Sequence, residues 1–195
     1  MDLDQLREAI VSGDPSRAMP ALAALREVPE EQAVPLLLLG LEQSTFMVRS
    51  LSCAGLGMKR NEAGWLALVQ ALEHDDDANV RAEAANALVS HSLQRAWPLL
   101  LPAFQRDSQW LLRCSILSAV AEHPEIPAED LLQLARLAIA DADGTVRVGG
   151  AEILGRLVHE GGGQAVAQQA RAELVTLQQD SDHRVVAAAL NGLQA

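Results

Sequence analysis

The sequence predicts an all-α fold, an α-solenoid of about six two-helix repeats. First, apolar residues make up 49% of the chain, and they are mostly Ala, Leu and Val, with no Tyr and two Phe. That composition suits close helix–helix contact better than β-sheet. Second, one phrase recurs along the chain at a nearly constant interval. Third, apolar residues within the phrase have helical spacing. Hairpins of this kind bury their apolar faces only against neighbouring hairpins.

The recurring phrase is an acidic residue, four further residues, an apolar residue, Arg and an Ala/Leu-rich segment. It is clearest at residues 75–88, 107–120 and 141–154, and weaker at 43–56. Its arginines are spaced 32, 32 and 34 residues apart, at Arg49, Arg81, Arg113 and Arg147. Degenerate copies occupy 14–25 and 180–193. We therefore expect a single domain over 1–195, with repeats at about 1–28, 29–60, 61–92, 93–125, 126–160 and 164–195.

Each repeat is expected to contain a first helix, a loop and a second helix. First helices are predicted around 33–41, 65–72, 97–104 and 131–138. In the second helix of the third repeat, Val80, Ala84 and Leu88 share one face. The acid that begins each loop is placed to cap this helix. Three glycines at 161–163 interrupt the pattern, and their conformational freedom predicts a hinge there.

The phrase resembles the HEAT repeat, in the short form found in phycobilisome-lyase-like bacterial proteins, and the resemblance covers 1–195. In that family the loop Asp and the helix Arg pair between or within repeats as a structural ladder. By position, the resemblance carries this over to Asp75 with Arg81, Asp107 with Arg113, and Asp141 with Arg147. Gln43 replaces the acid that precedes Arg49, and Val186 replaces the arginine of the last copy. We expect a looser stack at those two joints.

The charge balance argues against several kinds of partner. The chain has 26 acidic and 15 basic residues, a net charge of −11, which repels a phosphate backbone. Two cysteines without CxxC spacing fit a reducing compartment. The first ten residues lack the apolar segment of a signal peptide, and the longest apolar run, 34–41, is too short to cross a bilayer. We expect a cytoplasmic protein that binds neither nucleic acid nor membrane.

The inner face of the stack should come from second-helix positions that avoid the core. These positions form a mildly acidic, polar stripe of Glu83, Asn86, Ser118, Glu122, Glu152, Arg156 and Asn191. The stripe is either a solvated face or a groove for a basic or polar segment of a partner. Trp110 stands in a loop and is a candidate exposed anchor. Trp65 and Trp97 recur at one position of consecutive first helices and are expected to pack between helices.

No residue cluster predicts catalysis, a cofactor or a metal. The five histidines are scattered, and His91 and His123 lack a carboxylate or Cys nearby in the pattern. We therefore favour a non-enzymatic protein-binding adaptor, scaffold or assembly chaperone, while enzymatic activity stays open. The alternative that the resemblance implies is a phycobilin lyase subunit, or a phycobiliprotein chaperone or degradation factor. The last helix is almost uncharged, so the C-terminal repeat is expected either to fray or to be covered in a homo- or hetero-oligomer.

Overall fold

The computed structural model describes residues 2–121, 123–160 and 163–194. Gly161 and Gly162 of the predicted hinge, and Glu122 of the predicted stripe, lie outside these ranges. Within them the chain forms eleven α-helices and one 3₁₀ helix, with no strand, which confirms the all-α prediction. The chain divides into two compact units, Met1–Ser115 (unit 1) and Ile116–Ala195 (unit 2).

The helices follow one another with short loops. Unit 1 contains α1 (Leu3–Ile10), α2 (Pro15–Ala24), η1 (Leu25–Glu27), α3 (Glu30–Leu41), α4 (Phe46–Met58), α5 (Glu62–His74), α6 (Ala78–Arg106) and the start of α7 (Trp110–Val120). Unit 2 contains the rest of α7, α8 (Ala128–Ile139), α9 (Gly144–Glu160), α10 (Gln164–Leu177) and α11 (His183–Leu193).

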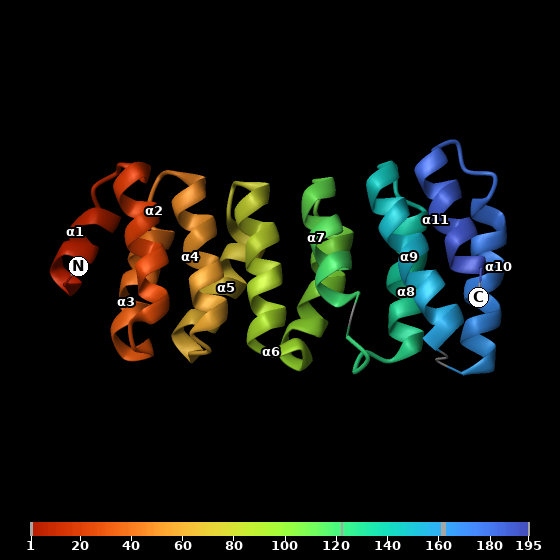
Figure 1. Ribbon diagram of the computed structural model, residues 1–195, viewed down its shortest axis with the longest axis horizontal. Helices are drawn as coiled ribbons and strands as arrows, with labels where there is room; N and C mark the ends of the chain where they lie inside the picture. Colours follow the sequence, from red (N-terminus) through yellow and green to blue (C-terminus); the bar gives the residue numbers. More distant parts are fainter. Residues whose placement is uncertain (1, 122, 161–162, 195) are drawn as a thin grey trace. The chain divides into compact units, whose positions relative to one another are not determined.

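Each unit is a stack of helical hairpins in two layers. In unit 1, α1 pairs with α2, α3 with α4, and α5 with α6; in unit 2, α8 pairs with α9 and α10 with α11. Second helices then contact the second helices of the next hairpin, so α4 lies between α2 and α6, and α9 lies beside α11 (Figure 1). First helices do the same, in α1–α3–α5 and α8–α10.

Helix α6 consists of two helices joined without a loop. Ser92 has an extended backbone, with φ −166° and ψ 103°, so the second helix of one hairpin ends at His91 and the next first helix begins at Leu93. A side-chain cluster spans this break. The Trp65 ring is buried, meets the His91 ring edge-on at 5.2 Å, and lies 4.1 Å from the Arg95 guanidinium. Trp65 is thus a packing residue, as expected.

Small residues allow the second helices to approach closely. A Cβ atom at Gly57 of α4 would lie 2.9 Å from the Cα of Ala87 on α6. In unit 2, a Cβ at Gly155 of α9 would lie 2.9 Å from the Cα of Gly192 on α11. Contacts of this kind explain why the core is rich in Ala and Leu and poor in aromatic residues.

Candidate functional site

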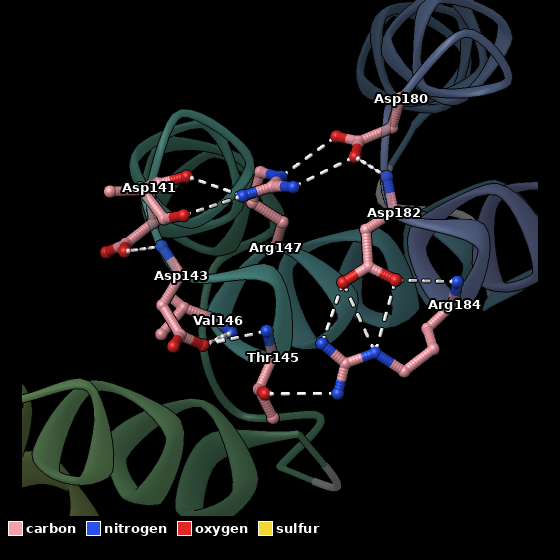
Figure 2. Close-up of polar contacts among 9 residues, drawn as sticks. Asp141, Asp143, Thr145, Val146, Arg147, Asp180, Asp182 and Arg184 are labelled. Atoms are coloured by element: carbon pink, nitrogen blue, oxygen red, sulfur yellow. Dashed lines mark hydrogen bonds and ion pairs between the residues drawn. The ribbon is translucent and has the colours of Figure 1, made fainter.

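The loops that precede α6, α9 and α11 share one geometry. In unit 1, the Asp75 carboxylate accepts from the backbone N–H of Asp77 at 2.9 Å, and the Asp77 carboxylate accepts from that of Asn79 at 2.8 Å. In unit 2, Asp141 and Asp143 repeat this arrangement at 2.8 Å each (Figure 2). The helix cap is therefore the third residue of the loop, and not the first as predicted, because the first carboxylate bonds a loop amide instead.

Three repeat arginines pair with the acid of the following repeat in the same unit. Arg49 donates to Asp75 through Nε at 2.8 Å and Nη2 at 2.9 Å. Arg81 donates to Asp107 at 2.6 and 3.1 Å. In unit 2, Arg147 donates to Asp180 through two bonds of 2.9 Å (Figure 2). We call these three bidentate pairs the ladder, which joins consecutive repeats.

The same arginines reach their own loops through backbone carbonyls. Nη1 of Arg81 donates to the carbonyl oxygen of Asp75 at 2.8 Å. Arg113 bonds the carbonyl of Asp107 at 2.6 Å, and Arg147 that of Asp141 at 3.1 Å. The within-repeat pairs expected from the resemblance are thus carbonyl contacts, and the carboxylate pairs run between repeats.

The carbonyl contacts explain one departure from the family pattern. Arg49 bonds the carbonyl of Gln43 at 3.1 Å, although Gln43 has no carboxylate. A carbonyl is available from any residue, so the loss of the acid does not release Arg49 from its own loop. What Gln43 cannot provide is a charged partner for an arginine in the preceding repeat.

The ladder carries charge in a partly desolvated setting. Its side chains are between 10% and 16% exposed. The hydrogen bond to Asp107 raises the pKa of Arg81. Burial alone would raise the pKa of Asp107, but the bonds from Arg81 and the Gln109 amide outweigh it and lower that pKa. Both groups are therefore ionised at neutral pH. The Asp107 carboxylate neutralises the Arg81 guanidinium and occupies two of its hydrogen-bond donors, which favours a structural role over the binding of an external anion.

The predicted polar stripe divides into two sets. In unit 1, Glu83 and Asn86 are half-buried on α6, and the Asn86 side-chain carbonyl accepts from the Ser115 hydroxyl at 3.1 Å. Burial raises the pKa of the Glu83 carboxyl. In unit 2, three residues on α7, α9 and α11 are exposed: Ser118, Glu152 and Asn191. Both sets lie on second helices, but only the set in unit 2 is exposed.

Two further predicted site residues, Arg156 and Trp110, differ in their contacts and exposure. Arg156 donates to the carbonyls of Val120 and Ala121, so its guanidinium holds the end of α7. This contact caps the C-terminal end of α7, and the partner-binding role of Arg156 stays a prediction. Trp110, the first residue of α7, is 46% exposed. It has the accessibility that an interface anchor requires.

An apolar groove between α2 and α4 escaped the sequence reasoning. It has a volume of ≈ 270 Å³, and we call it the α2–α4 groove. Its apolar walls are Leu22, Leu25, Leu37, Leu51, Ala54 and Met58. The predicted stripe consists of polar positions on second helices, so it does not include these apolar side chains. Met58 is nevertheless 55% exposed.

Other kinds of site find little support in the described ranges. No group of three or more His, Cys, Asp or Glu side chains there could hold a metal ion. Cys53 is buried, and desolvation raises its pKa to about 12, so the thiol is unreactive at neutral pH. No helix among residues 2–121, 123–160 and 163–194 is long and apolar enough to span a membrane.

The chain is similar to known repeat proteins in sequence and in structure. Residues 34–121 match the family model described as HEAT repeats. Escherichia coli YibA is similar over 99% of this chain and 70% of its own, with a TM-score of 0.69 and 19% identity. The complex of CpcE and CpcF of phycocyanin lyase from Nostoc sp. contains a chain with a TM-score of 0.60 and 21% identity, over 98% of this chain and 76% of that one.

A third structure is a computationally designed armadillo repeat protein for modular peptide recognition. Its TM-score is 0.57 at 18% identity, and 99% of each chain is covered. No curated protein sequence matches this chain. These likenesses confirm the predicted HEAT/armadillo-like α-solenoid fold.

Proposed function

We propose that this chain, whose residues 34–121 match the HEAT-repeat model, acts as a non-enzymatic scaffold or assembly chaperone that binds another protein through its second helices. The observation that carries the proposal is the set of accessible side chains on these helices. Ser118, Glu152 and Asn191 are exposed in unit 2, and Trp110 is exposed in unit 1. The ladder and its loops hold consecutive repeats together, and the exposed side chains of the second helices are left available for recognition.

The chemistry of these faces indicates the partner. Glu83 and Glu152 contribute carboxylates, and Asn86, Ser118 and Asn191 contribute neutral hydrogen-bonding groups. Within a chain of net charge −11, such faces favour a partner with basic or polar segments. Electrostatic complementarity of this kind accelerates encounter more than it tightens the final complex.

A pull-down with matched variants tests the proposal. The test variant combines Ser118→Arg with Glu152→Arg on second helices of unit 2. The control combines Gln133→Arg with Glu129→Arg, which makes the same charge change at exposed positions of the first helix α8. We expect wild type and control to retain one stoichiometric protein partner from native lysate, and the test variant to lose it. Equal retention by both variants would contradict the proposed face.

The second candidate is a phycobilin lyase subunit, or a phycobiliprotein chaperone or degradation factor. Two findings favour it: the short repeat type and the likeness to a chain of the CpcE–CpcF complex. Co-expression with a phycobiliprotein and bilin tests it by absorbance and by denaturing gel. Covalent pigment attachment that depends on this chain would support a lyase role; no attachment and no bound bilin would remove this candidate.

A further inference from the structure

We infer that the α2–α4 groove is a docking site for an amphipathic partner helix that carries a carboxylate beside its apolar face. The inference rests on the proposed function and specifies one contact of it. The groove differs from the polar stripe in both chemistry and position, since it lies in unit 1 between the second helices of the first two hairpins.

The size of the groove favours side chains over a small-molecule ligand. Its volume is ≈ 270 Å³, and small-molecule sites commonly span roughly 300–1,000 Å³. Leu37 of α3 forms the floor, while Leu51, Ala54 and Met58 of α4 form one wall. Such a cavity accepts one or two large apolar side chains. Met58 adds a flexible, polarizable wall that can adapt to different side chains.

The apolar surface continues beyond the groove along α4. Met47, Leu51, Ala54 and Met58 follow the i, i+4, i+7, i+11 spacing of one helical face. Met47 is 42% exposed and Met58 55% exposed. At 1.5 Å per residue the face is about 16 Å long, or three helical turns. A partner helix of that length can lay an apolar stripe along it.

The charged residues that line the groove indicate the charge of its occupant. None of the ten described residues that line the groove is acidic, whereas Arg26 and Lys59 are basic. Another pocket of unit 1 has a mixed lining, in which Arg81 and Arg106 stand beside Glu73, Asp75 and Asp107. In an acidic chain, a groove whose charged residues are both cations favours a carboxylate-bearing occupant.

Lys59 is held in place by neutral groups. Its Nζ donates to the carbonyl of Arg26 at 2.8 Å and to that of Val28 at 2.7 Å. These bonds tie the C-terminal end of α4 to η1 and fix the ammonium at the mouth of the groove. An ammonium group has three donors, so one remains for a partner's carboxylate. The positive charge itself is not neutralised by either carbonyl.

A displayed library of random peptides of about 12 residues, three helical turns, is the probe. It is selected on the full chain, and the affinities of enriched peptides are measured by fluorescence anisotropy. Two variants alter the groove, Met58→Asp and Arg26→Glu. Their matched controls are Leu66→Asp, at a 59% exposed apolar position on α5, and Arg17→Glu, at an exposed arginine on α2. Circular dichroism checks that all four variants fold.

We expect enriched peptides to combine large apolar residues at helical spacing with Asp or Glu. Either groove variant should weaken their binding about tenfold, and the controls less than about twofold. Exchange of the peptide's acid for Lys should restore binding to Arg26→Glu. The absence of acidic amphipathic peptides from the enriched set, or affinities of such peptides that ignore the groove variants, would each overturn the inference.

Two further results separate this inference from related ideas. Sedimentation of the wild type that reveals a dimer dissociated by Met58→Asp would make a second copy the occupant, and would overturn the assignment to a partner helix. Peptides that lose affinity for the Ser118→Arg, Glu152→Arg variant but not for the groove variants would also overturn it, while leaving the proposed function intact.

Discussion

Removal of one ladder arginine should destabilise unit 1 by an amount that the geometry bounds. In Arg81→Ala, two bonds to Asp107 and the bonds to the carbonyls of Asp75 and Asp76 are lost. Asp107, whose side chain is 11% exposed, keeps the hydrogen bond from the Gln109 amide. Exposed pairs contribute about 0–1 kcal/mol, and breaking a fully buried pair costs about 3–5 kcal/mol. An intermediate cost of about 2–3 kcal/mol is expected.

Urea unfolding followed by circular dichroism measures this cost. With a slope of about 1–3 kcal/mol per molar urea, the unfolding midpoint should fall by about 1 M or more. Arg81→Lys should recover only part of the loss, because lysine keeps the charge but cannot form the bidentate pair. Arg95→Ala is the control, since it removes a bidentate pair with Glu62 whose side chains are 44% and 64% exposed.

The comparison between the two arginines decides the outcome. Both substitutions remove one guanidinium from α6 and one bidentate carboxylate pair, and they differ in desolvation and in the carbonyl contacts. The control also removes the Arg95 contact with the Trp65 ring, which adds to its cost and works against the expected order. We expect Arg81→Ala to shift the midpoint clearly more than Arg95→Ala. A shift of equal size, or a larger shift for Arg95→Ala, would refute the claim that the ladder holds consecutive repeats together.

Three further predictions follow from particular residues. Glu83→Gln should raise the urea midpoint at pH 7 and have no effect below about pH 4, because burial raises the pKa of Glu83 and so opposes its ionisation in the folded state. The free energy of unfolding of the wild type should fall as the pH drops from about 5 to 2, because the folded-state pKa of Asp107 lies below its ordinary 3.8. The dependence of this free energy on pH should be weaker in Arg81→Ala. An unchanged dependence would contradict the pairing. Gly57→Ala should lower the free energy of unfolding by about 1–3 kcal/mol, because the new methyl group overpacks against the Ala87 backbone. Gly64→Ala should cost less, because its methyl group meets only the flexible Leu56 side chain at 3.1 Å. Equal shifts of the urea midpoint would contradict close packing of α4 on α6.

The fold was predictable because its signal is periodic. Arginines at 49, 81, 113 and 147 mark equivalent second helices, and apolar residues such as Val80, Ala84 and Leu88 are all buried as the helical spacing requires. Repetition of one pattern compensates for the weakness of each copy. A two-layer stack then follows, because no hairpin can bury both of its apolar faces alone.

The partners of the ladder were harder to predict for a geometric reason. Asp75 lies six residues before Arg81 and twenty-six after Arg49, and spacing alone favours the nearer arginine. In the structure the Asp75 carboxylate turns toward the Asp77 amide and Arg49, and leaves only its backbone carbonyl to Arg81. The direction of a side chain in a loop is a tertiary property that a linear pattern does not contain.

The groove was missed because exposed and buried apolar residues look alike in a sequence. Met58 and Leu56 lie two residues apart on α4, yet Met58 is 55% exposed and Leu56 is fully buried. Only the positions of α2 and α3 decide which of them is covered.

Each ladder pair is shared between two repeats, and this has a consequence for folding. A repeat on its own can satisfy the Nη1 atom of its arginine with its loop carbonyls, but the balancing negative charge arrives only with the next repeat. Part of the free energy of folding is therefore stored at the junctions, as nearest-neighbour coupling. Such coupling penalises a boundary between ordered and disordered segments, so repeats within one unit should melt together rather than one by one.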